Sequence, residues 1–351
     1  MHQWLRSSFE VTVTLTCALI GAFIFETLHA PLPWLLGAIV AIAIASRIKK
    51  LPLRSPKLFS APARAILGIT IGSAFNPTIL HSLEDFISSI VLILPYVLCV
   101  SFAGMLYYWK WLKFDKATAF FSAMPGGLLE MVILAESMKA NVYKVTLTQS
   151  ARLLLIVFTL PFVIQYLSHI PLDGRASIIQ PLMHSDPQDM MIITIGALVG
   201  WLGANKLKIQ GGTMIGPVIV GAIIYGSGWV HSRPPSEVIK VIQLILGSMV
   251  GFVFVGIRLK EIAKVLSQSL GHFVILSIIS VCFVLMVSTM VDIPLISILL
   301  SFSPGGQSEM NIMAILVGAN LPYVALHHIV RLFLVMSVAP ILMRKLSKKS
   351  E

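Results

Sequence analysis

Apolar and polar positions follow one another along the chain in long blocks. Twelve predominantly apolar segments, most of them about 17 to 25 residues long, are separated by short polar stretches. Blocks of this length predict membrane-crossing helices, because about 20 residues of helix span the hydrocarbon core of a bilayer. The segments lie at about residues 9–28, 31–47, 61–78, 86–108, 117–138 and 144–167 in the first half, and at about 190–205, 211–228, 239–256, 267–289, 294–318 and 323–343 in the second.

The fifth segment of each half is interrupted in its middle by a helix-breaking motif. Residues 125–131 read Pro-Gly-Gly-Leu-Leu-Glu-Met, and residues 304–310 read Pro-Gly-Gly-Gln-Ser-Glu-Met. Proline lacks a backbone donor and two glycines permit positive φ, so the motif predicts the end of one half-helix and the start of another. In a membrane, such open backbone is tolerated only where it is buried in protein or lines a watery cavity.

The two motifs belong to a repeat that covers most of the chain. Residue i resembles residue i+179 without a gap, for example in the pairs Gly68 with Gly247 and Arg152 with Arg331. This register predicts two homologous membrane repeats, residues 8–170 and 190–346, joined by a polar linker over residues 171–189.

Composition supports a polytopic membrane protein. Hydrophobic residues make up 57% of the 351 residues and charged residues 12%, and the mean hydropathy is +0.90. The net charge of +11 comes from short basic clusters between apolar segments, without a DNA-binding motif, so we expect no nucleic-acid partner. The first segment lacks a cleavage site and is interpreted as an uncleaved helix.

The orientation of the repeats depends on the fifth segment. If it crosses the membrane, the repeats are parallel (6+6) and place 17 Lys and Arg inside against 7 outside; Arg152 and Arg331 are left out of both counts. If it re-enters as a broken helical hairpin, each repeat has five transmembrane helices, the repeats are inverted, and the split is 21 against 3. The positive-inside rule favours the inverted arrangement, with both termini cytoplasmic.

Ionisable residues inside the apolar segments are the strongest candidates for function. Glu130 and Glu309 fall in the first turn of the second half-helix, where the helix dipole favours a carboxylate and where a coupling cation, H⁺ or Na⁺, could be held. Arg152 and Arg331 could attract an anionic solute together with the free amide groups of the half-helices. Alternatively, each glutamate caps its own half-helix or pairs with the arginine of its repeat. The motif positions in the predicted site are Pro125, Gly126, Gly127, Pro304, Gly305 and Gly306.

Four further polar residues flank the breaks and are weaker candidates. Ser122 and Ser301 precede the breaks, and Asn141 and Asn320 follow the predicted hairpins. Each could contact a ligand, although capping of helices and turns is the more ordinary role. The histidines and the three cysteines show no metal-ligand spacing, so we expect neither a metal nor a cofactor. The Gly-xxx-Gly patterns at positions 68 and 72 and at positions 247 and 251 predict close helix packing.

With its two Pro-Gly-Gly-x-x-Glu-Met motifs and its 179-residue duplication, the sequence resembles the membrane AbrB duplication family over essentially its whole length. Members of that family are also labelled ammonia monooxygenase or AbrB-type regulator. The layout of five crossings and one hairpin per repeat is similar to that of several secondary transporters, including sodium-coupled glutamate carriers.

The sequence thus predicts a secondary transporter rather than an enzyme. We expect a multi-pass protein of the bacterial inner membrane that moves a small anionic or zwitterionic solute with a coupling cation, by alternating access at a midplane site between the two hairpins. A membrane sensor that affects gene expression indirectly is the alternative, and a monooxygenase is the least favoured reading. Its expected partners are the lipid bilayer, the solute and the cation, and association into homo-oligomers is left open.

Overall fold

A computed structural model describes residues 2–75, 83–172, 185–209 and 211–348. Every regular element in these ranges is a helix, so the expected all-α class is confirmed. The chain forms two compact units, and each unit draws on both sequence repeats. Unit 1 is Met1–Ile79, Leu160–Ile257 and Ile315–Gly318, and unit 2 is Leu80–Thr159, Arg258–Ala314 and Ala319–Glu351. Most of the predicted polar linker, residues 173–184, lies outside the described residues.

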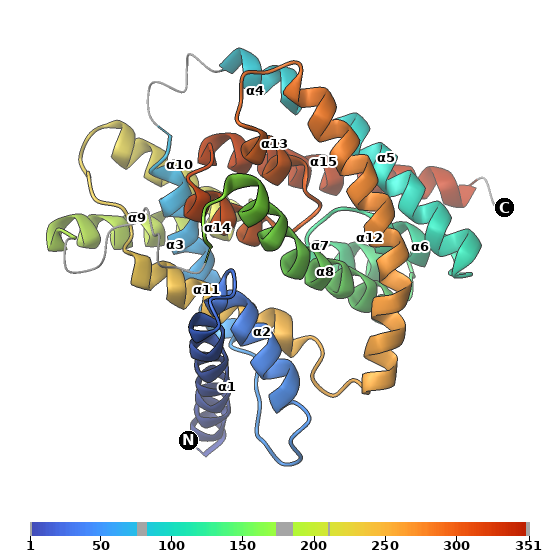
Figure 1. The fold of residues 1–351 in the computed structure, drawn as a ribbon, viewed down its shortest axis with the longest axis horizontal. Helices are drawn as coiled ribbons and strands as arrows, with labels where there is room; N and C mark the ends of the chain where they lie inside the picture. The colour runs from blue at the N-terminus through green and yellow to red at the C-terminus, as the bar shows by residue number, and fades with distance from the viewer. Residues whose placement is uncertain (1, 76–82, 173–184, 210, 349–351) are drawn as a thin grey trace. The chain divides into compact units, whose positions relative to one another are not determined.

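Unit 1 contains three helices from the start of each repeat (Figure 1). In the first repeat α1 packs on α2, and in the second α9 packs on α10; across the repeats α3 packs on α10 and α2 on α11. These contacts come in pairs because α1, α2 and α3 match α9, α10 and α11 in the 179-residue register. The helices are α1 (His2–Thr27), α2 (Pro33–Ala45), α3 (Ser60–Gly72, after the short 3₁₀ turn η1, Lys57–Phe59), α9 (Pro187–Lys206), α10 (Gly212–Gly226) and α11 (Ser236–Phe252).

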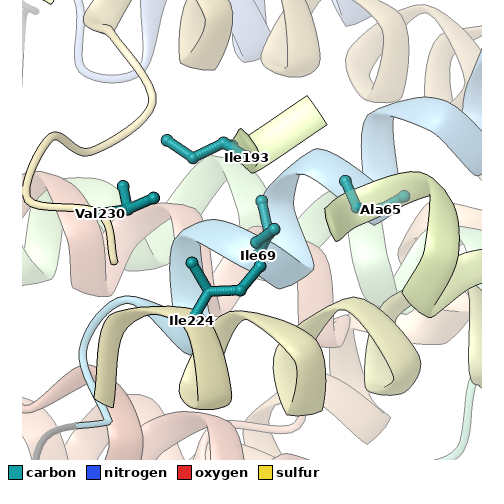
Figure 2. Packing of buried hydrophobic residues seen from close by; sticks show 6 residues of the cluster. Ala65, Ile69, Ile193, Ile224 and Val230 are labelled. Carbon is teal, nitrogen blue, oxygen red and sulfur yellow. The ribbon is translucent and has the colours of Figure 1, made fainter. Parts of the chain in front are cut away.

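A compact apolar cluster joins three of these helices (Figure 2). Ala65 and Ile69 of α3 lie among Ile193 of α9 and Ile224 of α10, and Val230 closes the cluster from the loop after α10. All five side chains are almost fully buried. Burial of such side chains stabilises unit 1 by about 1.5–3 kcal/mol for each large aliphatic group.

Glycines let the helices of unit 1 approach closely. A Cβ atom added at Gly72 would lie 2.6 Å from the carbonyl oxygen of Val218, and one added at Gly251 would lie 2.8 Å from that of Ile39. Real Cβ atoms do not come this close to a carbonyl, so a larger residue would force the helices apart. The packing role predicted for the Gly-xxx-Gly patterns is confirmed at these positions.

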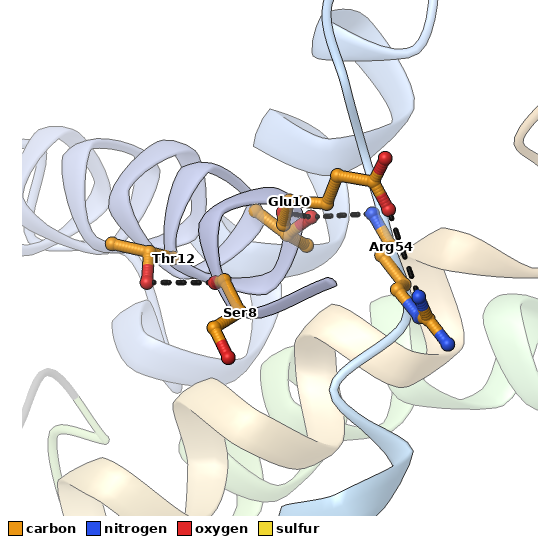
Figure 3. Close-up of polar contacts among 5 residues, drawn as sticks. Ser8, Glu10, Thr12 and Arg54 are labelled. Atoms are coloured by element: carbon orange, nitrogen blue, oxygen red, sulfur yellow. Dashed lines mark hydrogen bonds and ion pairs between the residues drawn. The ribbon is translucent and has the colours of Figure 1, made fainter. Parts of the chain in front are cut away.

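Polar contacts attach the segment before η1 to α1 (Figure 3). The backbone N–H of Arg54 donates to Thr14 Oγ1 over 2.9 Å, and the Arg54 guanidinium lies 3.8 Å from a carboxylate oxygen of Glu10. Thr14 itself donates to the carbonyl oxygen of Glu10, one helical turn earlier. A neighbouring threonine, Thr12, makes the same kind of bond to the carbonyl oxygen of Ser8.

Asp189, in the first turn of α9, fixes the loop that follows α10. Its Oδ2 accepts hydrogen bonds from the backbone N–H groups of Ser232 (2.8 Å) and His231 (3.1 Å). These bonds favour the ionised carboxylate, and the bond from Ser232 has the largest effect, so the pKa of Asp189 lies below its ordinary value.

Unit 2 contains the remaining helices of both repeats (Figure 1). Here α5 packs on α6 and on α12, and α13 packs on α12 and on α15. The elements are α4 (Leu83–Ile90), α5 (Ile93–Leu106), the π-helical turn η3 (Tyr107–Trp111), α6 (Lys116–Ala123), α7 (Leu128–Ser137), α8 (Val142–Ser168), α12 (Leu259–Ser288), α13 (Leu295–Phe302), α14 (Gln307–Val317) and α15 (Leu321–Lys348). Two of these helices continue into unit 1, because unit 2 includes α8 only as far as Thr159 and α14 only as far as Ala314.

In the ranges that the structure describes, five helical stretches are long and apolar enough to cross a membrane by length and composition. They are Ser7–Thr27, Phe86–Trp111, Val142–Ser168, Leu259–Ser288 and Leu321–Met343. The chain is therefore an all-helical protein with membrane-spanning character. Some other segments form shorter helices than the sequence predicts. For example, α2 and α3 have 13 residues each. Such a helix is about 20 Å long and does not reach across a hydrocarbon core of about 30 Å by itself.

Candidate functional site

Both predicted helix breaks are present, and both lie in unit 2. The first half-helix of repeat one, α6, begins after Asp115, whose carboxylate accepts from the backbone N–H of Thr118. It ends at Ala123, the chain is extended at Met124, and α7 starts at Leu128. In repeat two, α13 and α14 bracket the second motif, and each starts 179 residues after its counterpart.

The glycines of the motifs do not act as the sequence suggested. Positive φ among the described glycines occurs at residues 211, 228, 256 and 318, and none of these belongs to a motif. The motif glycines instead provide space. A Cβ at Gly127 would collide with a carboxylate oxygen of Glu130, and a Cβ at Gly306 would collide with one of Glu309. The expectation that these glycines turn the chain through positive φ is therefore wrong. The glutamate carboxylates lie against Gly127 and Gly306 in the space that a Cβ would take.

Hydrogen bonds join the two ends of each broken segment. The backbone N–H of Asn141, just after α7, donates to Thr118 Oγ1 near the start of α6 over 2.8 Å. At the matched positions of repeat two, the N–H of Asn320 donates to Ser297 Oγ over 2.9 Å. A continuous helix of this length would separate its ends by roughly 35 Å, at 1.5 Å per residue. Each segment therefore turns back on itself and forms a helical hairpin.

Asn141 and Asn320 also begin the helices that follow the hairpins. Asn141 Oδ1 accepts from the backbone N–H of Lys144 at 3.0 Å, and Asn320 Oδ1 accepts from that of Tyr323 at 3.2 Å. These are ordinary N-cap bonds of α8 and α15. The structure thus assigns both asparagines a role in closing the hairpin and starting the next helix.

Two buried arginines bind backbone carbonyl oxygens at the breaks. Arg152 Nη1 donates to the carbonyl oxygen of Met124 (2.9 Å) and Nη2 to that of Gly126 (3.0 Å). Arg331 binds the carbonyl oxygens of Ser303 (2.6 Å) and Gly305 (2.7 Å) in the same way. The arginine side chains are only 1% and 6% exposed. Each guanidinium binds carbonyl groups of the non-helical residues between the two half-helices, two from each break.

A second side chain supports each arginine from one helical turn earlier. Gln149 Nε2 donates to the carbonyl oxygens of Phe121 (2.6 Å) and Met124 (3.0 Å). The matched residue His328 contacts the carbonyl oxygen of Leu300 through Nε2 (3.0 Å) and Arg331 Nη2 through Nδ1 (2.8 Å). Since a guanidinium only donates, His328 Nδ1 is the acceptor and Nε2 carries the proton. These two residues differ by 179 positions and so match in the repeat, but the sequence does not indicate that they bind the carbonyl groups of the breaks.

Glu130 and Glu309 lie in the first turn of α7 and α14, as predicted. Glu130 is half-buried, and Glu309 is 8% exposed. Among the described residues, Glu130 forms no ion pair with Arg152, whose two terminal nitrogens are taken by backbone carbonyls. The carboxylates fold back towards the glycines at the start of their own half-helices, where the helix dipole favours negative charge.

The helix that carries Arg152 also contacts the second break. Ile156, one turn after Arg152 on α8, lies against Gly305, where an added Cβ would be 3.3 Å from Ile156 Cγ2. The structure therefore brings the two breaks of unit 2 into one neighbourhood with two buried positive charges. Arg152 Nε remains without a hydrogen-bond partner among the described groups.

The serines that precede the breaks have different surroundings. Both Ser122 and Ser301 are buried. Ser301 donates to the carbonyl oxygen of Ser297 within its own helix, at 2.7 Å. Ser122 Oγ has no partner among the described residues. Within the same ranges, no group of three or more His, Cys, Asp or Glu side chains is placed to hold a metal ion.

Sequence reasoning missed two polar residues on the second hairpin. Gln307 and Asn311 lie one turn apart on α14, and Asn311 is fully buried. Their counterparts in the first motif are Leu128 and Val132, so a comparison of the two repeats would have identified them as unusual.

Comparison with known proteins agrees with the predicted resemblance. The sequence model of the AbrB family, described as transition state regulatory protein AbrB, matches residues 34–347. A Bacillus subtilis (strain 168) relative named "Uncharacterized protein YhjN" is 27% identical, over 91% of this chain and 88% of its own length. An Escherichia coli (strain K12) relative named "Putative regulator AbrB" is 22% identical, over 92% of both chains. Since the family model covers most of the sequence, the chain belongs to the AbrB family.

Proposed function

We propose that this protein is a secondary transporter that moves a small anionic or zwitterionic solute together with H⁺ or Na⁺. One observation carries the proposal. Each repeat contributes a broken helical hairpin whose ends are joined by a hydrogen bond and whose break is held by a buried arginine. Open backbone of this kind inside an apolar protein is typical of solute sites in transporters made of repeats.

The hairpins also support the inverted arrangement. A segment that returns to its starting point does not cross the membrane. If the other five apolar segments of each repeat cross it, the number of crossings is odd, and an odd number inverts the second repeat relative to the first. The distribution of 21 Lys and Arg inside against 3 outside favours the same topology. In this arrangement the protein lies in the bacterial inner membrane with both termini in the cytoplasm, and the two hairpins enter from opposite sides.

The buried positive charges near the breaks favour an anionic group in the solute. Arg152 and Arg331 place two positive charges in the interior, and their terminal nitrogens already satisfy the hairpin carbonyls. An anionic group entering between the hairpins would balance this charge without displacing those bonds. Glu130 and Glu309, at the starts of α7 and α14, supply carboxylates for the coupling cation.

Flux through reconstituted protein tests the proposal. Proteoliposomes should accumulate a solute from a panel of small anions and zwitterions when a proton or sodium gradient is imposed, and should not do so without the gradient. Glu130→Gln and Glu309→Gln should abolish gradient-driven uptake at wild-type protein abundance. Glu136→Gln is the matched control, because Glu136 is an exposed carboxylate in the last turn of the same half-helix as Glu130.

Two results would count against transport. If purified protein binds a solute but moves none under any gradient, the protein is a membrane sensor. Such a sensor could have a regulatory role, and the name of the Escherichia coli relative contains the word regulator. If both glutamine variants lose folded protein to the same extent as activity, the carboxylates serve as structural caps.

A further inference from the structure

The second hairpin carries polar groups that the first one lacks. Although the two breaks share their helix starts, their glycines and their arginine braces, α14 has Gln307 and Asn311 where α7 has Leu128 and Val132. The first hairpin forms without these amides. The construction of the hairpin therefore does not require them.

Asn311 is buried, and only one of the two polar atoms of its side chain has a hydrogen-bond partner among the described groups. It is 0% exposed, and its Nδ2 donates to the carbonyl oxygen of Gln307 over 2.8 Å. This contact fixes the orientation of the amide, because the reverse orientation would place two oxygens against each other. Oδ1 then has no donor among the groups that the structure describes.

Gln307 adds a complementary unsatisfied group on the same face of α14. Its Nε2 is buried and has no acceptor among the described residues. Residues four apart on a helix lie on the same face, so an amide donor and an amide acceptor, each without a partner among the described groups, project from one face of α14. Buried polar atoms without partners are costly, and native proteins retain few of them without a reason such as a ligand or an ordered water.

From this pair we infer that the second hairpin binds a zwitterionic solute with an α-amino-acid head group. The carboxylate of the solute accepts from Gln307 Nε2, and its ammonium group donates to Asn311 Oδ1. A simple anion would satisfy the glutamine but would bring no donor to the asparagine oxygen. The inference rests on the proposed function and selects the zwitterion from the two solute classes named there.

Thermal unfolding of the purified full-length protein in lipid nanodiscs tests this assignment. Each common L-α-amino acid is added in turn, since a ligand that binds only the folded state raises the unfolding midpoint. At least one should raise the midpoint, whereas its analogue without the amino group and its analogue without the carboxylate should not. Asn311→Val and Gln307→Leu, which give the second hairpin the residues of the first, should weaken binding roughly tenfold or more, as expected for one hydrogen bond to a charged group.

The unliganded midpoint separates a binding role from a structural one. Gln307→Leu removes an unsatisfied buried group, so its midpoint without ligand should equal or exceed that of the wild type. Asn311→Val removes the unsatisfied Oδ1 together with the bond from Nδ2, so its midpoint should stay close to that of the wild type. Val132→Ala, at the matched position of the first hairpin, should leave ligand binding unchanged. The assignment is overturned if no amino acid binds, if the analogue without the amino group binds as well as its parent, or if Asn311→Val retains wild-type affinity.

Flux distinguishes this failure from failure of the transport proposal. An amino acid that binds in the predicted way but is not carried into proteoliposomes refutes transport and leaves the head-group assignment intact. A simple carboxylate that is carried while amino acids are not refutes the assignment and leaves transport intact.

Discussion

Arg152→Lys tests whether the buried arginines hold the helix breaks. Arg152 donates one hydrogen bond from each terminal nitrogen to the carbonyl oxygens of Met124 and Gly126. Lysine keeps the charge, but its single ammonium cannot reproduce the geometry of the planar fork. Loss of one of the two charge-assisted bonds should lower the free energy of unfolding by about 2 kcal/mol, from the range of roughly 1.5–3 kcal/mol for such a bond.

Lysine is a cleaner replacement than an apolar residue. Arg152→Met would leave the carbonyl oxygen of Gly126 without its bond from Arg152, at about 1–3 kcal/mol, whereas that of Met124 would keep its bonds from Gln149 Nε2 and from the backbone N–H of Gly126. It would also remove the cost of burying a charge, so the two effects would partly cancel. Arg331→Lys should behave like Arg152→Lys, because its bonds to the second hairpin follow the same pattern.

The measurement is reversible unfolding in mixed micelles with increasing sodium dodecyl sulfate, followed by circular dichroism. Arg233→Lys, at an exposed position in unit 1, is the control and should stay within about 0.5 kcal/mol of the wild type. If Arg152→Lys unfolds with the same free energy as the control while solute affinity falls, the arginine binds solute and does not brace the break.

Three further predictions concern pH, packing and topology. Because its folded-state pKa is depressed, Asp189 should stabilise the fold fully above its unfolded pKa of about 3.9 and lose this contribution as the pH falls through the folded value, so Asp189→Asn should flatten the acid limb of the stability curve. Gly72→Ala should destabilise unit 1, since the new Cβ meets a carbonyl oxygen, whereas Gly203→Ala, with nothing within 4 Å, should stabilise α9 by up to about 1 kcal/mol. Single cysteines at Asn141 and Asn320, on a background without native cysteines, should be labelled by impermeant thiol reagents from opposite sides of the membrane; labelling from one side would refute the inverted repeats.

Local chemistry predicted the positions of the breaks well. A proline followed by two glycines within an apolar run removes helical hydrogen bonds, and α6 and α13 end just before these residues. The placement of Glu130 and Glu309 in the first turn of the next half-helix follows from the same reasoning and is confirmed. Such features depend on a few consecutive residues, which is why the sequence reveals them.

Long-range contacts were beyond such reasoning. Arg152 lies 28 residues from Met124, and nothing in the sequence indicates that its guanidinium binds that carbonyl oxygen rather than a glutamate. Likewise, the composition of the compact units depends on packing between the repeats, because α3 packs on α10 and α2 on α11. Helix lengths were overestimated for α2 and α3 because flanking apolar residues such as Leu32 and Phe75 extend a hydropathy segment beyond the helix itself. Residues 76–78, at the end of the segment that contains α3, lie outside the described residues.

Because the chain contains two repeats, each position in one hairpin can be compared with its matched position in the other. Arg152 and Arg331 occupy matched positions and bind the carbonyl oxygens of their breaks in the same pattern, so these residues build the hairpin. Where the repeats differ, as with Val132 and Asn311, the hairpin forms with either residue. Substitution at equal positions should therefore reduce folding and function together, whereas exchange between unequal positions should change function and spare the fold. The effect on folding can be measured without knowledge of the solute, because the free energy of unfolding of each exchange variant can be compared with that of the wild type.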